Sequence, residues 1–281
     1  MKKKTILFVF IFAVLIGAIG LYIFYKINPK NNLHETILQT LSGAKGKYSV
    51  VVEDLKNGKK ESFNGNKVYG AASLYKLWVM AETFRQIQNG TLSKNETLSE
   101  DINTLNKDFD ISTESAELTE GKITSTVRDA LKQMITISHN YSALLLIKRV
   151  GLSNVAKFLL KNGFINSHIG GIPTSTAEDI AAFFEKLYKG ELANTKYTQE
   201  MLDLLKAQKL NGKLPKYLPK EIVIAHKTGE INYLSHDAGI IYTKNKDYII
   251  VVLSESNYPP GAVERIAQIS KAVFDYFSTK N

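Results

Sequence analysis

Residues 73–84, SLYKLWVMAETF, place a serine and a lysine three positions apart at the start of an apolar repeat. The apolar side chains recur there at intervals of three and four, which is typical of an amphipathic helix: Leu74, Leu77, Trp78, Ala81 and Phe84. Residues three apart share one face of a helix, so we expect Lys76 one turn along from Ser73. The sequence therefore predicts a helix that opens at Ser73, stops at residues 89–90, and brings a hydroxyl and an amine together.

Strand patterns lie near both ends of the chain, outward from this helix. Short β-branched and apolar runs occur at residues 48–52, 60–63, 222–225, 238–242 and 248–253. Asn57 and Gly58 between the first two runs, and residues 244–246 between the last two, predict hairpins.

Apolar residues with helical spacing occur in the middle of the chain and in its first and last segments after residue 32. They are found at residues 33–41, 127–135, 144–150, 175–187, 198–205 and 263–277. Either Ser175 or Thr176 has the right spacing to cap the fourth of these helices. We predict an α/β (α+β) fold in which an antiparallel sheet from the N- and C-terminal segments is flanked by helices and carries an inserted all-helical subdomain.

The first 32 residues differ from the rest of the chain. Residues 5–25 contain no charged side chain and follow three lysines at residues 2–4. At 1.5 Å per residue, a helix of this length reaches about 31 Å, which spans the hydrocarbon core of a bilayer. We predict a cytoplasmic tail at residues 1–4, a transmembrane signal anchor at 5–25, a linker at 26–32 and an extracytoplasmic domain at 33–281. The alternative is secretion after signal cleavage near Ala18 and Gly20.

Composition excludes several kinds of chemistry. The 281-residue chain has no cysteine, which excludes thiol nucleophiles, thiolate metal sites, disulfides and lipidation at cysteine. Its five histidines are scattered and no HExxH motif is present, so neither a metal nor a cofactor is indicated. The net charge of +9 is spread along the chain rather than concentrated in one segment, so we expect no nucleic-acid partner. We also expect a monomer.

Three short motifs carry the candidate chemistry: residues 73–76 (SLYK), 138–140 (SHN) and 227–229 (KTG). Each is weak alone, and a second Ser-x-x-Lys occurs at residues 42–45. Context favours the first motif, because no apolar helix follows residues 42–45. A serine hydroxyl needs a neighbouring base at neutral pH, and a lysine serves as that base when burial and nearby positive charge lower its pKa.

With the three motifs in this order, residues 33–277 resemble the penicillin-recognising serine hydrolases, and among them the class A β-lactamases. The resemblance implies ligands of the β-lactam or D-alanyl-D-alanine type. It also implies that Ser73 attacks the carbonyl, that Lys76 takes the serine proton, and that Ser138 passes a proton to the leaving nitrogen.

Substrate binding is assigned by the same resemblance. Asn140 is implied to hold the catalytic lysine and the substrate amide. The KTG motif, Lys227, Thr228 and Gly229, is implied to bind the substrate carboxylate. The backbone N–H groups of the nucleophilic serine and of Glu230 are implied to form the oxyanion hole.

One part of the family pattern is missing. Class A β-lactamases carry a glutamate on an Ω-shaped loop that activates the water which clears the acyl-enzyme. Between Arg149 and Glu178 this sequence has no Asp or Glu, and residues 164–172 are short for such a loop. We therefore expect acylation to proceed and β-lactam turnover to be slow, unless His168 orients water.

Three further polar positions carry expectations. The charge of Glu230 is expected to oppose an anionic ligand, and His139 is expected to be structural. His236 and Asp237 are candidates for a His/Asp pair, although a structural role at a strand entry is the preferred interpretation.

The sequence thus predicts a membrane-anchored, extracytoplasmic serine hydrolase that forms an acyl-enzyme. A D,D-peptidase acting on peptidoglycan and an esterase or transferase using the same serine stay open as alternatives. A non-catalytic penicillin-binding sensor is a further alternative. It is disfavoured because residues 1–4 are too few to carry a signalling domain.

Overall fold

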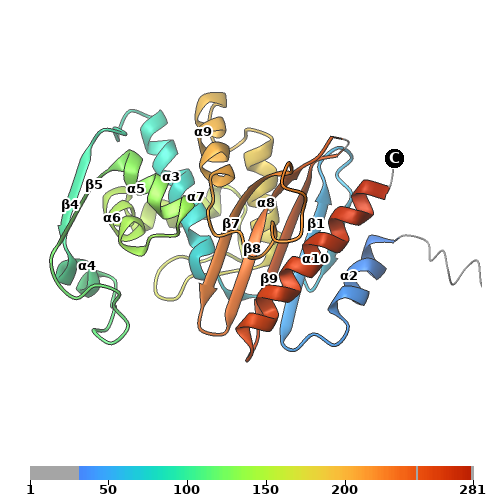
Figure 1. The fold of residues 1–281 in the computed structure, drawn as a ribbon. Coiled ribbons are helices and arrows are strands. Elements are labelled where there is room, and N and C mark those ends of the chain that lie inside the picture. Colours follow the sequence, from blue (N-terminus) through green and yellow to red (C-terminus); the bar gives the residue numbers. More distant parts are fainter. Residues whose placement is uncertain (1–31, 245, 280–281) are drawn as a thin grey trace, which may run out of the picture.

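The computed structural model describes residues 32–244 and 246–279. Its centre is a five-stranded antiparallel sheet with the strand order β2-β1-β9-β8-β7 (Figure 1). The strands are β1 (Lys47–Asp54), β2 (Lys60–Phe63), β7 (Val223–Ile231), β8 (Leu234–Tyr242) and β9 (Tyr248–Glu255). Strands from the two ends of the chain therefore form one sheet, which confirms the predicted fold class.

The two ends of the chain meet where β1 pairs with β9. Val51 lies opposite Val251 in this register. Val51 belongs to the apolar core on one face of the sheet, whereas Val50 and Val52 belong to the core on the other face. Because successive side chains of a strand point to opposite faces, both faces of the sheet are apolar and both need a cover.

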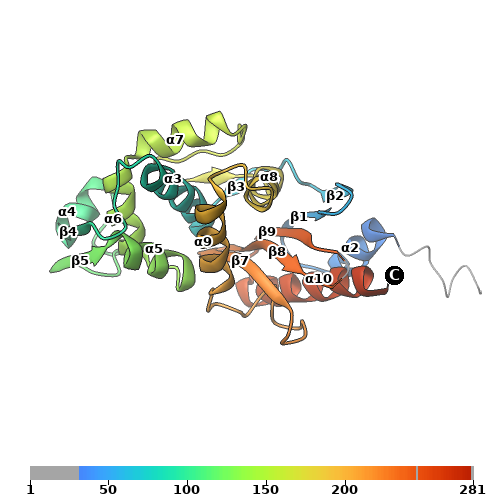
Figure 2. The ribbon, with the colours of Figure 1, turned by 90° about the horizontal axis from the view of Figure 1, so that it is seen from above.

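Helices cover both faces of the sheet (Figure 2). The first and last helices, α2 (Leu33–Leu41) and α10 (Pro259–Thr279), pack together over one face. Helix α8 (Ala177–Tyr188) packs on the other face, against β1, β8 and β9. Of the two predicted caps, the one at Thr176 forms, because its hydroxyl accepts the Asp179 N–H at 3.2 Å.

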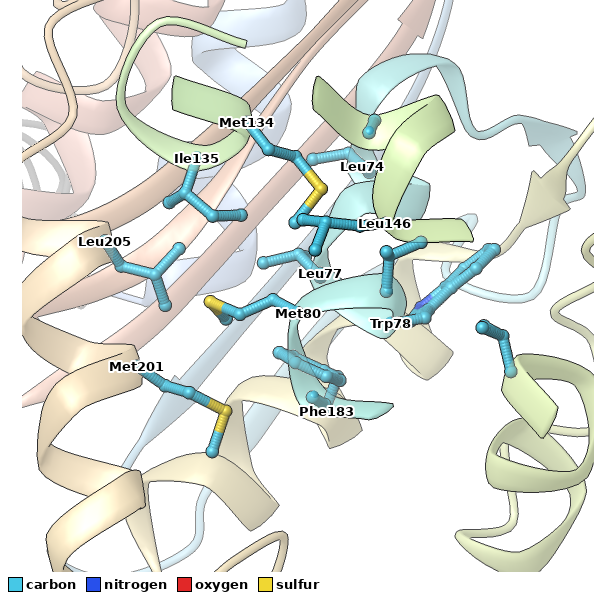
Figure 3. Packing of buried hydrophobic residues seen from close by; sticks show 14 of the residues in the cluster. Leu74, Leu77, Trp78, Met80, Met134, Ile135, Leu146, Phe183, Met201 and Leu205 are labelled. Atoms are coloured by element: carbon cyan, nitrogen blue, oxygen red, sulfur yellow. The ribbon is translucent and has the colours of Figure 1, made fainter. Parts of the chain in front are cut away.

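The remaining helices form the predicted all-helical part, which lies beside the sheet (Figure 1). It consists of α3 (Lys76–Gln88), α4 (Ile102–Asp108), α5 (Val127–Thr136), α6 (Asn140–Val150), α7 (Leu152–Lys161) and α9 (Thr195–Lys206). Helix α3 is its core, because it is buried almost all round. Figure 3 shows Leu77 and Met80 of α3 close to Met134 of α5, Leu146 of α6 and Met201 of α9.

Two short strand pairs complete the fold. β3 (Tyr69–Gly70) pairs with β6 (Thr174–Ser175), just before the first motif. β4 (Thr97–Asp101) pairs with β5 (Lys122–Thr126), at the outer edge of the helical part. Residues 109–121 connect α4 to β5.

Three elements differ from the sequence prediction. β7 continues through the KTG motif instead of ending at residue 225, and β8 begins at Leu234 instead of residue 238. The added residues include buried polar side chains such as Lys227 and His236, which an apolar run does not reveal. The helix at Ser73 begins as a 3-10 turn, η1 (Ala72–Tyr75), and only then becomes the α-helix α3.

The predicted tail, anchor and linker, residues 1–4, 5–25 and 26–32, lie outside the described residues except for Asn32. Across the described ranges, no helix is both long enough and apolar enough to cross a bilayer.

Candidate active site

Ser73 lies on η1, and the chain that leads to it is fixed on both sides. The Gly70 carbonyl accepts a hydrogen bond from His236 Nε2 at 2.8 Å. The Ala71 N–H donates to the Pro173 carbonyl at 2.7 Å. Ser73 is half-buried, and its hydroxyl has no hydrogen-bond partner within the part of the chain that the structure describes. The turn therefore presents a hydroxyl that is positioned and unengaged.

Two backbone positions in the site are left-handed. Ala72, immediately before the nucleophile candidate, has φ of +43°, and Ser138 has φ of +60°. A residue with a side chain enters this region at a cost of about 1 kcal/mol or more, and such strain is concentrated at functional sites. The strain at Ala72 and Ser138 therefore marks the same two motifs that the sequence singled out.

Lys76 is fully buried at the start of α3, and three acceptors surround its amine. The distances from Lys76 Nζ are 2.6 Å to Ser138 O, 3.2 Å to Ser138 Oγ and 2.6 Å to Asn140 Oδ1. Burial lowers the pKa of Lys76 to about 7, although the carboxylate of Glu117 raises it in part. A large fraction of this amine is therefore neutral near pH 7.

The partners of Lys76 determine where its lone pair points. A neutral amine has two protons to donate, and both Ser138 O and Asn140 Oδ1 can only accept. The lone pair is left facing the Ser138 hydroxyl, which is the one partner able to donate. Lys76 is therefore placed to exchange a proton with Ser138.

The SHN motif connects α5 to α6. His139 is the N-cap of α6, because its Nδ1 accepts the Ser142 N–H at 3.1 Å. Burial lowers the pKa of His139, which favours the neutral ring that this contact requires. The prediction that His139 is structural is confirmed.

Lys227 brings the third motif to the same point. It lies on β7, the edge strand of the sheet, and its Nζ donates to Ser138 Oγ at 3.0 Å and to Thr228 O at 2.8 Å. Burial, together with the charge of the neighbouring lysine, lowers its pKa well below the ordinary value. At Gly229 a Cβ would lie 3.3 Å from the Ala71 carbonyl, so glycine allows β7 to run close to η1.

The expectation for Glu230 needs correction. Its carboxylate forms an ion pair with Lys213, whose side chain is buried. Its charge is therefore paired with a cation and does not face an anionic ligand alone. No motif marks Lys213, which lies in the irregular segment before β7 and meets Glu230 only through the tertiary fold.

The His/Asp pair also differs from the one the sequence suggested. Asp237 pairs with His226, at 2.9 Å from its Nδ1, and also accepts the Leu214 N–H at 3.0 Å. Adjacent residues of a strand point to opposite faces, so His236 turns the other way, toward Gly70. Both histidines are buried inside the sheet, which confirms a structural interpretation.

The short loop, residues 164–172, lies within the connection from α7 to β6, and an acid outside the loop anchors it. Asp179 of α8 accepts hydrogen bonds from the Asn166 N–H at 2.9 Å and from the Ser167 hydroxyl at 2.8 Å. His168 is exposed and pairs with β6 through its backbone. The sequence has no acid within the loop, and no sequence pattern indicates that Asp179, outside the loop, anchors it.

A carboxylate that no sequence motif marks also lies at the site. Glu117, in the α4–β5 connection, accepts a hydrogen bond from Asn140 Nδ2 at 2.5 Å. This contact explains the orientation of the Asn140 amide, because a carboxylate accepts only and therefore faces the amide nitrogen. The amide oxygen is thereby turned toward Lys76.

A model of the Beta-lactamase enzyme family matches residues 32–277. The chain belongs to the beta-lactamase enzyme family. The resemblance that the three motifs carry is therefore confirmed over nearly the whole described chain. No curated protein sequence matches this family member.

Solved structures share the fold of this beta-lactamase family member. PBP-A superposes with a TM-score of 0.76 at 25% identity, over 88% of this chain and 96% of that chain. A PBP-A mutant in an acyl-enzyme complex with penicillin G gives 0.76 at 24% identity, over 89% and 97%. The β-lactamase from Sphaerobacter thermophilus DSM 20745 gives 0.76 at 21% identity, over 87% and 97%. The last two likenesses show the shared fold.

Within this family fold, the predicted site residues fall into two groups. Lys76, Ser138, Asn140 and Lys227 form one continuous hydrogen-bonded cluster beside the turn that carries Ser73. The other predicted residues, Thr228, Gly229 and Glu230, follow Lys227 along β7. The oxyanion hole formed by two backbone N–H groups stays a prediction.

Proposed function

We propose that this protein is a serine hydrolase that forms an acyl-enzyme on Ser73 with β-lactams and D-alanyl-D-alanine-type peptides. The observation that carries the proposal is the meeting of Lys76 and Lys227 at the Ser138 hydroxyl, beside η1. The acyl-enzyme complex of the PBP-A mutant with penicillin G supports the same chemistry on this fold.

The hydrogen-bonded cluster provides the proton transfers that acylation requires. Ser73 Oγ attacks the carbonyl carbon, and its proton moves to the neutral amine of Lys76. The carbon–nitrogen bond then breaks, and the leaving nitrogen takes the proton of Ser138. The Ser138 hydroxyl is restored by a proton from Lys76, whose amine donates to the Ser138 oxygen at 3.2 Å. A positioned base of this kind contributes roughly 10² to 10⁴ in rate.

Binding is assigned to both sides of the reacting carbonyl. The ammonium of Lys227 would bind the substrate carboxylate, together with Thr228, and the new negative charge would favour protonation of Lys227. Asn140 would bind the substrate amide through the N–H that Glu117 leaves free. The N–H groups of Ser73 and Glu230 would stabilise the oxyanion, and losing one such donor typically costs about 10² to 10³ in rate.

Deacylation of a β-lactam adduct is proposed to be slow. The short loop holds no carboxylate, and Asp179 behind it is engaged with the loop itself. A D,D-peptidase activity is the second candidate, because a site without a strong water-activating base suits transfer to a peptide better than rapid β-lactam hydrolysis.

The proposed location is the extracytoplasmic side of a membrane. It rests on the uncharged residues 5–25 and the lysines before them. Protease treatment of intact cells should remove the hydrolase domain, and digestion only after lysis would contradict this location.

A fluorescent penicillin tests the proposed chemistry. The full-length protein should become covalently labelled, and Ser73→Ala should not. Ser42→Ala is the matched control, because it removes the serine of the second Ser-x-x-Lys from an exposed position and should leave labelling intact. A label that persists for minutes supports slow deacylation, and decay within seconds would exclude it.

A further inference from the structure

Glu117 is held beside Asn140 by the residues that follow each of them. The Leu118 N–H donates to the hydroxyl of Tyr141 at 3.1 Å, and Asn106 Nδ2 donates to the Leu118 carbonyl at 2.9 Å. Tyr141 is buried and directly follows Asn140. The position of the Glu117 carboxylate is therefore coupled to the position of the substrate-binding amide.

The Glu117 carboxylate is exposed and has no ion-pair partner among the residues that the structure describes. No Lys or Arg occurs at residues 108–121. The nearby amine of Lys76 is buried and partly neutral, so it does not fully compensate the charge. The Glu117 carboxylate therefore places an uncompensated negative charge next to Asn140, where the acyl group of a donor would bind.

We propose that Glu117 is a specificity-determining residue that selects acyl donors carrying an ammonium group next to the amide bound by Asn140. This inference rests on the proposed acyl transfer at Ser73, and it names the donor class of that reaction. The donor's amide accepts the remaining Asn140 N–H, and an ammonium one carbon away then lies within reach of Glu117. A carboxylate at the same carbon is repelled.

Three penicillins with nearly the same shape test the proposal. Ampicillin carries an amino group on the carbon next to its side-chain amide, carbenicillin carries a carboxyl group there, and penicillin G carries neither. The measured quantity is the ratio of second-order acylation rates, ampicillin to carbenicillin, at pH 6. Both substrates use the same catalytic lysine, so changes in its protonation cancel in this ratio.

The full-length protein should acylate about five-fold or more faster with ampicillin than with carbenicillin, since one contact attracts and the other repels. Glu117→Gln should bring the ratio close to one, and Glu117→Lys should invert it. Glu120→Gln removes the same charge from the same exposed segment without a contact to Asn140, and it should keep the ratio of the unmodified protein. The preference should become smaller above about pH 8, where an α-amino group loses its proton and only the repulsion of the carboxylate is left.

A ratio near one in the unmodified protein, or an unchanged ratio in Glu117→Gln and Glu117→Lys, would overturn the role of Glu117 while leaving the acyl transfer intact. Absence of labelling by all three penicillins would instead overturn the proposed function and, with it, this inference.

Discussion

The amines of Lys76 and Lys227 both donate to one atom, the hydroxyl oxygen of Ser138, at 3.2 and 3.0 Å. Two ammonium groups that share a buried partner repel one another, and burial disfavours both charges. A site of this kind holds one of its lysines neutral near pH 7. Lys76 is the proposed base, and Lys227 is the proposed charge that an anionic substrate would stabilise.

The rate of acylation is expected to depend on pH through Lys76. Its neutral form is the base, so the rate of acylation by penicillin G should rise with pH and level off above the lysine pKa of about 7. Lys76→Met should lower the plateau rate above that pKa by roughly 10² to 10⁴ and remove the dependence on pH. Stopped-flow measurements between pH 5.5 and 8.5 check both statements, and a flat profile in the unmodified protein would argue against lysine as the base.

Glu117→Gln is expected to shift this pH profile. Among the described residues, the charged and titratable groups around Lys76 are Glu117, Lys227, His139 and Tyr75, and Glu117 is the one that raises the lysine pKa. Removing its charge should lower the pKa of Lys76 and move the rising part of the profile to lower pH. Glu120→Gln should leave the profile unchanged. Identical profiles in all three proteins would show that Glu117 does not act on Lys76.

His236 is expected to make folding stability depend on pH. Burial lowers its pKa to about 4, whereas the unfolded chain has the ordinary value of about 6.5. Between these values the unfolded state binds more protons, so stability is fully present above about pH 6.5 and is lost as pH falls toward about 4. The loss should reach up to about 3 kcal/mol. Urea unfolding at several pH values should show this slope in the unmodified protein and a flatter one in His236→Gln.

Asp179→Ala is expected to loosen the short loop. Asp179 is buried and accepts from both Asn166 and Ser167. Its removal leaves the Asn166 N–H without its acceptor and the Ser167 hydroxyl with Ser175 alone, and the free energy of unfolding should fall by about 1–3 kcal/mol. His168→Ala, in the same loop but exposed, should change it by less than about 0.5 kcal/mol. Equal effects of the two substitutions in urea unfolding would show that Asp179 does not anchor the loop.

Patterns of apolar residues were sufficient to predict most of the fold. They placed the strands at both ends of the chain and the helices between them, because burial follows a period of two in strands and near 3.6 in helices. They failed where a strand buries polar groups, as at Lys227 in β7 and His236 in β8, because such residues interrupt the apolar run.

Only the part of the site that lies in the three short motifs was predictable from the sequence. The convergence of Lys76, Ser138, Asn140 and Lys227 is implied by the family resemblance that the three motifs carry, and it is found in the structure. The contact of Glu117 with Asn140 spans 23 residues of chain and depends on how the α4–β5 connection folds back. A contact of this kind has no local signature, so tertiary structure is needed to find it.

The central claim is that Ser73 becomes covalently acylated, and mass spectrometry after incubation with penicillin G tests it most directly. The account predicts that the full-length protein gains the complete mass of penicillin G, that the peptide containing Ser73 carries it, and that Ser73→Ala gains nothing. An adduct on another serine, or no adduct at any time from seconds to minutes, would contradict it.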